Sequence, residues 1–256
     1  KIVIGESVTR IIEGEPFTHP EIRTVLTIIR ERFPSTTVQL TTNGTLLDRA
    51  MAGFLAGLKP VELNLSLNSS CPATRTMLMS DRQAGQAIAA AELLREHRIP
   101  YHGSIVAMPH LTVWTDLEET VRYLAVQGAR TIRIFRPGFS GLAPAELQVP
   151  PGLWADLIAF VVKLRQEISV PLTVEPVPQT DLKAGVTGVI IDSPAQRAGI
   201  RPGDIVIKVR GEAAFSRVDA FEKVRQAGGR TNWSWSGGVR FSLRLLKNRS
   251  GHLRVW

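Results

Sequence analysis

Up to about residue 141, two kinds of segment alternate along the chain. In one kind apolar residues recur at every second position, and in the other they recur three or four positions apart. In VELNLSLN, residues 61–68, every second residue is apolar, which predicts a strand with one buried face. In HPEIRTVLTIIRERF the apolar residues Ile22, Leu26 and Ile29 recur three or four positions apart, which predicts a helix. Strands and helices that alternate in this way imply parallel strands with helical crossovers, and therefore an α/β sheet or barrel.

The strand pattern occurs five times in this part of the chain. The predicted strands are Val8–Ile12, TTVQLTTNG, VELNLSLNSS, YHGSIVAMP and RTIRIFRPG. The predicted helices are HPEIRTVLTIIRERF, a segment near Leu46–Leu55, RQAGQAIAAAELLREHR and TDLEETVRYLAVQG, the last with Thr115 or Asp116 as its N-cap. Because ligands of such folds bind at the carboxyl ends of the strands, the residues that follow each strand are the first candidates for a site.

The pattern changes near residue 142, where the Pro-rich segment LAPAELQVPPG interrupts it. One more amphipathic helix, LWADLIAFVVKLRQEI, follows this break. The remainder predicts a helix in SRVDAFEKVRQA and short strands in GVTGVIID, GDIVIKVRG, VRFSLRLL and HLRVW. We therefore expect two domains, residues 1–168 with the α/β pattern and residues 169–256 with a small, mostly β fold.

The composition is that of a soluble globular protein. Of the 256 residues, 44% are hydrophobic and 21% are charged. The longest apolar candidate, 153–164, is interrupted by Asp156 and Lys163, so it falls short of the roughly 18 apolar residues that a membrane span needs. No signal peptide is visible at the start. These observations favour a cytoplasmic protein without a membrane-spanning segment.

The net charge and the number of cysteines indicate which binding partners and metal sites the chain does not favour. The formal net charge is +8, but the Lys and Arg residues are spread through the chain, so nucleic acid is an unlikely partner. Cys71 is the single cysteine, which excludes an internal disulfide framework and any metal site built from cysteines of this chain alone. Cys71 is interpreted either as a reactive thiol or as a small, partly buried residue, and the second interpretation is favoured.

The segment EGEP, residues 13–16, is an unusual end for a strand. Gly14 permits backbone conformations that other residues avoid, and Pro16 cannot donate a hydrogen bond to a neighbouring strand. Glu15 lies between them. The segment is either an ordinary turn into a helix or a turn whose acidic side chain holds a ligand.

The segment GVIIDSPAQRAGIRPGDIVIKVRG, Gly188–Gly211, resembles the core of a bacterial PDZ domain. In that pattern Asp192 or Ser193 can cap a short helix, Gly199 can take a left-handed conformation at its end, and Gly203 can form the turn into a strand. The resemblance implies a domain that binds an extended peptide or protein segment by strand addition. EPVPQTDLKAGVTG has no clear match to the family's carboxylate-binding loop, so peptide binding and internal docking are both retained.

Residues 1–165 resemble a radical S-adenosylmethionine (radical SAM) enzyme. The resemblance rests on the EGEP turn and on TTNGTLL, LNLSLNSS, GSIVAMP and IRIFRPG, which follow in the family's order. It implies a partial (βα)6 barrel in which family strands 2 to 6 are present, with S-adenosylmethionine and a [4Fe-4S] cluster as cofactors. In the family, the Glu and the backbone carbonyls of the turn hold the cofactor's amino group, a role that falls here to Glu15 with Gly14 and Pro16.

The resemblance also implies cofactor-binding residues on the next strands. Ser66 and Asn68 of LNLSLNSS fall where the family contacts the ribose and the carboxylate, and Ser104 is a further candidate donor. Asn43 belongs to the same set, although an Asn-Gly pair is also a turn signal by itself. No residue of this chain is assigned a catalytic or metal-binding role.

Two departures from the family pattern limit this interpretation. Glu13 stands where the family has its first glycine, and the Cys-x3-Cys-x2-Cys loop that binds the cluster is absent. One hypothesis is that the cluster ligands belong to a missing N-terminal segment, so that the full-length protein is an enzyme and this chain alone is inactive. The alternative is a non-catalytic protein in which a degenerate barrel supports a peptide-binding PDZ module. The substrate cannot be named from the sequence, although a peptide or protein is a candidate.

The remaining candidates are weaker. His19 and His110 lie at strand ends and His102 begins a strand, so we do not expect the three to bind one metal ion. Arg75 and Arg136 are interpreted either as partners of a carboxylate or of the substrate, or as members of surface salt bridges.

Overall fold

The computed structural model describes residues 1–5, 14–138, 144–176, 181–227 and 233–235. Its internal contacts divide the chain into two compact units. The first comprises Lys1–Ser169 with Thr173–Pro176, and the second comprises Val170–Leu172 with Val177–Trp256. Each unit is described separately below.

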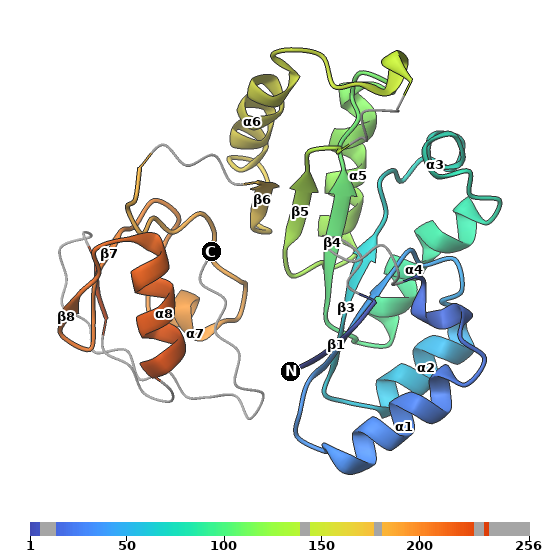
Figure 1. Ribbon diagram of the computed structural model, residues 1–256, viewed down its shortest axis with the longest axis horizontal. Helices are drawn as coiled ribbons and strands as arrows, with labels where there is room; N and C mark the ends of the chain where they lie inside the picture. The colour runs from blue at the N-terminus through green and yellow to red at the C-terminus, as the bar shows by residue number, and fades with distance from the viewer. Residues whose placement is uncertain (6–13, 139–143, 177–180, 228–232, 236–256) are drawn as a thin grey trace. The chain divides into compact units, whose positions relative to one another are not determined.

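The first unit is built on a six-stranded parallel sheet (Figure 1). Its strands are β1 Ile2–Ile4, β2 Val38–Thr42, β3 Val61–Ser66, β4 Tyr101–Val106, β5 Ile132–Phe135 and β6 Leu172–Glu175. The order across the sheet is the order along the chain, β1-β2-β3-β4-β5-β6. Helical crossovers connect the strands, as parallel pairing requires, and the result is the partial barrel expected from the sequence.

Helices fill the connections between these strands. They are η1 Pro16–Thr18, α1 Ile22–Arg32, α2 Arg49–Gly57, α3 Pro72–Met79, α4 Ala84–Glu96, α5 Trp114–Val126, η2 Ala145–Leu147 and α6 Leu153–Leu164. In Figure 1, α1, α2, α4 and α5 lie along the same side of the sheet. Within the described residues no helix is long and apolar enough to cross a membrane.

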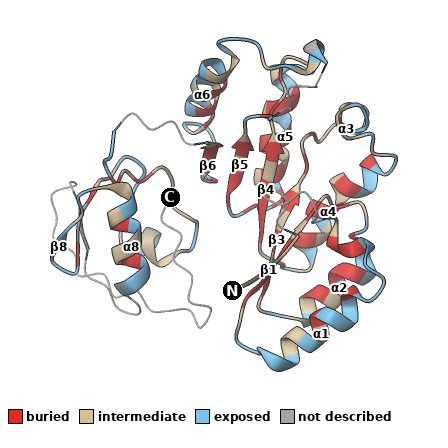
Figure 2. Cartoon of the chain, in the orientation of Figure 1, coloured by how far each residue is buried: buried red, intermediate tan, exposed pale blue. Residues whose placement is uncertain are grey.

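The two faces of the sheet differ in character. A Cβ atom added to Gly103 of β4 would lie 2.7 Å from Cδ1 of Leu124, so this side of the strand faces α5. Leu65 of β3 is the register partner of Gly103 and is fully buried on the same side. Ser66 and Ser104, the next residues of the two strands, therefore point to the opposite face. Buried residues follow the strands and the surfaces of the helices packed on them (Figure 2).

The sequence predicted four of the six strands, at 38–42, 61–66, 101–106 and 132–135. The strand expected at Val8–Ile12 lies outside the described residues. The observed strands Ile2–Ile4 and Leu172–Glu175 were not predicted, the first because it is only three residues long and the second because prolines flank it. Helix α5 begins at Trp114 with Val113 as its N-cap residue.

The N-cap predicted for α5 was therefore wrong. Neither Thr115 nor Asp116 caps the helix, because both lie inside it. Asp116 is instead buried, and its Oδ1 accepts a hydrogen bond from Oγ of Ser69 at 2.7 Å. The acidic side chain thus connects α5 to the loop that follows β3.

The second unit contains a small antiparallel sheet of order β8-β7-β9. Its elements are α7 Pro194–Arg197, β7 Val206–Val209, β8 Glu212–Ala213, α8 Arg217–Ala227 and β9 Trp233–Trp235. The core of this unit is formed by Ala184, Val186, Ile200, Val206, Val209, Ala220 and Val224. A small sheet with α8 packed on β7 is consistent with the PDZ-like fold expected from the sequence.

The local signals of the PDZ-like segment are confirmed. Oγ of Ser193 accepts a hydrogen bond from the N–H of Gln196 at 3.2 Å and caps α7. Gly199 and Gly203 have φ values of +80° and +93°, the left-handed conformation that glycine adopts without strain. GVTGVIID, predicted as a strand, forms only an isolated bridge from Gly185, whereas VRFSLRLL and HLRVW lie outside the described residues.

Candidate functional site

The turn that contains Glu15 lies beside the carboxyl ends of β1 and β2. Gly5, directly after β1, has a φ of +78°, and a Cβ atom there would lie 2.8 Å from the carbonyl oxygen of Thr41 and 3.1 Å from Cγ of Pro16. A side chain at position 5 would therefore collide with β2 and with the turn. The close approach brings residues 14–16 to the edge of the sheet where ligands of parallel sheets bind.

Glu15 is held in place by three hydrogen bonds. Its carboxylate accepts them from Oγ1 of Thr42 at 2.7 Å, from the N–H of Asn43 at 2.7 Å and from the N–H of Phe17 at 3.3 Å. The first two donors belong to the end of β2, and the third belongs to η1. A carboxylate offers about four acceptor sites, so Glu15 is fixed by the fold and retains capacity for a further donor.

The two neighbours of Glu15 differ in how strongly the fold constrains them. Pro16 is buried and begins η1. Gly14 is exposed, and a Cβ atom there would meet nothing within 4 Å. Packing within the described residues therefore gives no reason for glycine at position 14, whereas it requires glycine at position 5.

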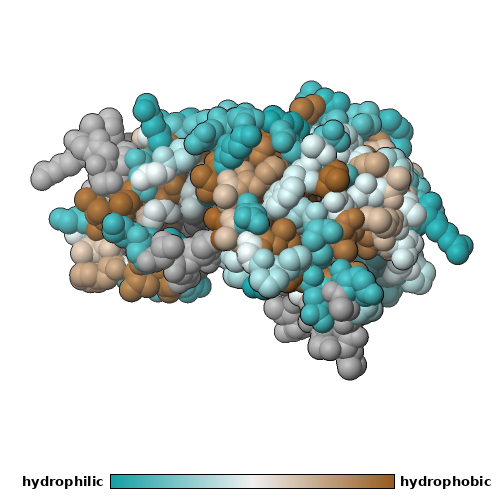
Figure 3. All heavy atoms as spheres, turned by 90° about the horizontal axis from the view of Figure 1, so that it is seen from above, coloured by the Kyte–Doolittle hydropathy of each residue, from teal (hydrophilic) through white to brown (hydrophobic). Residues whose placement is uncertain are grey.

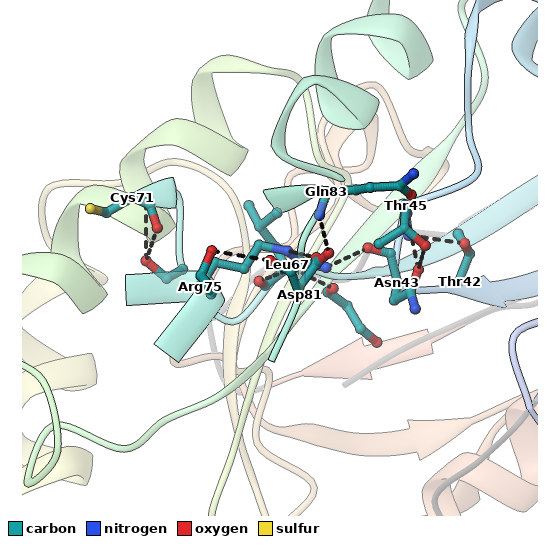
Figure 4. Close-up of polar contacts among 12 residues, drawn as sticks. Thr42, Asn43, Thr45, Leu67, Cys71, Arg75, Asp81 and Gln83 are labelled. Atoms are coloured by element: carbon teal, nitrogen blue, oxygen red, sulfur yellow. Dashed lines mark hydrogen bonds and ion pairs between the residues drawn. The ribbon is translucent and has the colours of Figure 1, made fainter. Parts of the chain in front are cut away.

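Asn43 shapes the turn after β2, as its alternative interpretation expected. Its Oδ1 accepts hydrogen bonds from the N–H and the Oγ1 of Thr45 at 2.9 and 2.7 Å (Figure 4). The following residue, Gly44, has a φ of +83°, and a Cβ atom there would lie 2.9 Å from the carbonyl oxygen of Ala87. The part of Asn43 that contacts the candidate site is its backbone N–H, which donates to Glu15.

Ser66, the last residue of β3, and Ser104, in the second half of β4, form a pair of hydroxyl groups. The two residues are register partners in neighbouring parallel strands, and both are partly exposed. Neither hydroxyl has a hydrogen-bond partner within the part of the chain that the structure describes. Because the fold does not use them, both hydroxyls are available to a ligand at this edge of the sheet.

Asn68 connects the ends of the same two strands. Its Oδ1 accepts a hydrogen bond from the N–H of Val106 at 2.9 Å, and its φ of +63° places it in the left-handed region. Asparagine tolerates this conformation better than most residues. Its Nδ2 has no partner among the described residues and is the group of Asn68 that remains for a ligand.

A hydrogen-bonded cluster lies on the same polar face, nearer the amino ends of the strands. Nε2 of Gln39 donates to Oε1 of Glu62 at 2.9 Å and to Oδ1 of Asn64 at 3.3 Å. Nδ2 of Asn64 donates to Oγ1 of Thr41 at 3.2 Å, and Lys1 pairs with Glu62. Our sequence analysis did not single out these residues, although the alternation of polar residues in VELNLS signals them.

Arg75 is buried, which both interpretations of this residue missed. It is fully buried in α3, where Nε pairs with Oδ2 of Asp81 at 2.8 Å. It is therefore neither a member of a surface salt bridge nor a direct partner of a substrate carboxylate. Arg136 is exposed, and its guanidinium carbon lies 5.9 Å from the ring centroid of Trp154.

Cys71 occupies the N-cap position of α3 and is partly exposed. Hydrogen bonds from the backbone and the hydroxyl of Thr74 lower the pKa of the Cys71 thiol, because they stabilise the thiolate. Elsewhere Nδ1 of His102 lies 2.7 Å from Oγ1 of Thr131. The described ranges contain no group of three His, Cys, Asp or Glu residues placed to hold a metal ion.

The second unit exposes several large apolar side chains. Phe215 is 83% exposed, and Val218 and Phe221 of α8 are 70% and 43% exposed. Val218 and Phe221 are three residues apart on the helix and therefore lie on one face. Hydrophobic side chains at the surface are visible in the space-filling view (Figure 3).

Two known families match separate parts of the chain. Residues 3–124 match the radical SAM superfamily. Residues 185–233 match a PDZ domain.

Solved structures share the fold of the first unit. Streptococcus suis SuiB bound to its precursor peptide SuiA is 17% identical, with a TM-score of 0.53 over 64% of this chain and 37% of SuiB. SuiB bound to S-adenosylmethionine gives 17% identity and a TM-score of 0.51 over 64% of this chain and 36% of SuiB. A domain of the pyruvate-formate lyase-activating enzyme from Bacteroides vulgatus ATCC 8482 is 13% identical, with a TM-score of 0.50 over 68% of this chain and 97% of that domain.

Proposed function

From the match of residues 3–124 to the radical SAM superfamily and of residues 185–233 to a PDZ domain, we propose that the parallel sheet of this chain binds S-adenosylmethionine. The proposed site is the carboxyl-end edge formed by the turn at 14–16 and the ends of β2, β3 and β4. The observation that supports it most is that a carboxylate fixed to the end of β2 and two hydroxyls that the described fold does not use lie on three neighbouring strands.

The chemistry of the ligand suits these groups. The methionine part of S-adenosylmethionine is zwitterionic, so its ammonium needs an acceptor and its carboxylate needs donors. Glu15 supplies the negative acceptor, and its hydrogen bonds to β2 fix the direction of approach. The hydroxyls of Ser66 and Ser104 supply donors, and Nδ2 of Asn68 supplies a third. Asn43 contributes through its backbone and Pro16 by starting η1, so both act by placing Glu15.

The [4Fe-4S] cluster of the family does not fit the residues of this chain. Three thiolates are needed to hold such a cluster with one iron open, and the chain has only Cys71. We therefore propose that the full-length protein is an enzyme that cleaves S-adenosylmethionine reductively, with cluster thiolates that come from outside this chain. The residues described here bind and orient the cofactor.

Calorimetry with S-adenosylmethionine tests the proposed site. We expect the double variant Ser66→Ala/Ser104→Ala to bind about thirtyfold more weakly than wild type, since each of the two lost hydrogen bonds is worth about 1 kcal/mol. Its melting temperature should not change, because neither hydroxyl has a partner in the described structure. Ser35→Ala, an exposed serine before β2, is the matched control and should bind as wild type does. Unchanged affinity of the double variant would contradict the assignment.

The single cysteine also favours a second candidate, a non-catalytic barrel that supports the PDZ domain. Iron and acid-labile sulfide, measured on the full-length gene product purified without oxygen, separate the two. About four of each per chain would support the enzyme. No iron after reconstitution would support the non-catalytic alternative.

For the PDZ domain we propose a peptide or protein segment as the ligand. The exposed Val218 and Phe221 support this, because they lie on one face of α8 and apolar side chains gathered on one surface favour an interaction. A library of peptides with apolar carboxyl ends, measured by fluorescence anisotropy, provides the test. Phe221→Ser should weaken any binding found, and binding that does not depend on Phe221 would remove α8 from the proposed surface.

A further inference from the structure

Arg75 contacts the ends of two strands that carry the proposed cofactor site. Its Nη2 donates to the carbonyl oxygen of Asn43, just after β2, at 2.7 Å. Its Nη1 donates to the carbonyl oxygen of Ser66 at 3.2 Å and to that of Leu67 (Figure 4). One planar cation thus joins the end of β2 to the end of β3.

Asp81 fixes the orientation of this guanidinium. Its Oδ2 accepts from Nε of Arg75 at 2.8 Å, while its Oδ1 accepts from the N–H of Gln83 at 2.7 Å. The side chains of Arg75 and Asp81 are 0% and 8% exposed. Burial lowers the pKa of Arg75, and the neighbouring Asp81 carboxylate acts in the opposite direction. A buried ion pair of this kind adopts one geometry, because any other would leave charge and carbonyl groups without partners.

One residue connects Arg75 to Glu15 of the proposed cofactor site, and one other residue connects it to Asn68. Asn43 accepts from Arg75 through its carbonyl and donates to Oε2 of Glu15 through its N–H. Leu67 accepts from Arg75 and precedes Asn68, whose Oδ1 holds the N–H of Val106. A shift of the guanidinium would therefore move both sides of the site.

We propose that Arg75 is a positioning residue of the S-adenosylmethionine site, which sets the separation between the end of β2, where Glu15 is bound, and the end of β3, which carries Ser66 and Asn68. This inference rests on the proposed function. It gives Arg75 no contact with the ligand. A lysine cannot replace it, because an ammonium group lacks the planar fork that contacts three carbonyls and a carboxylate together.

The first test separates positioning from general stability. Arg75→Lys should bind S-adenosylmethionine about tenfold or more weakly than wild type, since small displacements of binding groups have large effects. Leu55→Ala in α2 is the matched control, because it empties a fully buried site with none of these contacts. It should lower the melting temperature while its affinity stays within about twofold of wild type. The inference would be overturned if Arg75→Lys kept wild-type affinity, or if both variants lost affinity in proportion to their melting temperatures.

Hydrogen exchange gives a readout that does not depend on the cofactor. In Arg75→Lys the amide protons of Asn43 and Val106 should exchange about tenfold faster than in Leu55→Ala, because both report on the strand ends that Arg75 joins. Unchanged exchange at both amides would overturn the positioning role. If the wild-type protein itself failed to bind S-adenosylmethionine, the proposed function would be wrong, and Arg75 would have no cofactor site to position. Hydrogen exchange would still decide whether Arg75 fixes the ends of β2 and β3.

Wild-type protein supplies a third measurement if Arg75→Lys does not fold. Titration with S-adenosylmethionine, followed by nitrogen-15 spectra, should shift the Nε and Nη resonances of Arg75 together with the amide of Asn43. Arg75 is buried and is proposed not to touch the ligand, so its shift would report transmission through the backbone. A shift at Asn43 without one at Arg75 would overturn the inference.

Discussion

The two faces of the parallel sheet share the same strands but are constrained in different ways. On β3, Leu63 and Leu65 are 0% exposed against the helices, whereas Glu62, Asn64 and Ser66 on the other face are partly exposed and polar. The first face fixes the fold by burial, which requires only apolar side chains of suitable size. The second face fixes particular groups by hydrogen bonds, and it leaves some of them unused. The polar side chains that would bind a ligand can therefore change from one protein to another while the helix-covered face, and with it the fold, is kept.

The largest effect on the free energy of unfolding is expected within β3, where two consecutive residues lie on opposite faces of the sheet. Leu65→Ala should lower the free energy of unfolding by about 2–5 kcal/mol, because it leaves a cavity in the core. Ser66→Ala, one residue further on the other face, should change it by less than about 0.5 kcal/mol. Urea denaturation of both variants measures the difference. If both variants lost the same free energy of unfolding, the polar face would contribute to stability as much as the buried face does, and the proposed difference between the two faces would be wrong.

A smaller effect is expected in the polar cluster near the amino ends of the strands. Gln39 is only 4% exposed and donates to both Glu62 and Asn64. Gln39→Ala should cost about 1–3 kcal/mol, since it removes two hydrogen bonds that are each worth about 0.5–1.5 kcal/mol. Urea denaturation measures this cost, and the conservative variant Thr41→Val, which removes one acceptor from Asn64, should cost less. A neutral Gln39→Ala would show that the polar face is dispensable along its whole length.

The smallest effect concerns reactivity rather than stability. Hydrogen bonds from Thr74 lower the pKa of the Cys71 thiol, so more thiolate is present at neutral pH than for an ordinary cysteine. The rate of alkylation by iodoacetamide should therefore reach half its maximum at a lower pH than for an ordinary cysteine. Thr74→Val removes the hydroxyl donor and should move this midpoint upward. A midpoint that does not respond to Thr74 would assign the shift to another cause.

The spacing of apolar residues was sufficient to predict four of the six strands, because apolar and polar residues alternate along a strand that has one buried face. It failed at β6, Leu172–Glu175, where the prolines on either side read as a break although the residues between them pair with β5. Prolines at the ends of a strand remove no hydrogen bond from its middle, so their presence does not exclude a strand.

The candidate site was predictable only in part. The resemblance to the radical SAM family indicated Ser66, with Ser104 as a further candidate donor, but their pairing depends on strand register, which the sequence does not reveal. Arg75 could not have been recognised as buried, because a charged residue is expected at the surface unless its partners are known. The EGEP motif drew attention to Gly14, whereas the close approach of the backbone is at Gly5.

The agreement between strand order and chain order has a consequence for how the first unit forms during synthesis. Each strand from β2 to β6 pairs with the strand made immediately before it, so no strand waits for a distant partner. Every new strand and helix can add to an edge that already exists as the chain leaves the ribosome. The last strand made at any moment is the exposed edge, and the next one covers it. Growth in one direction thus limits the time for which the growing edge is open to another molecule, whereas β1 stays at the other edge of the described sheet.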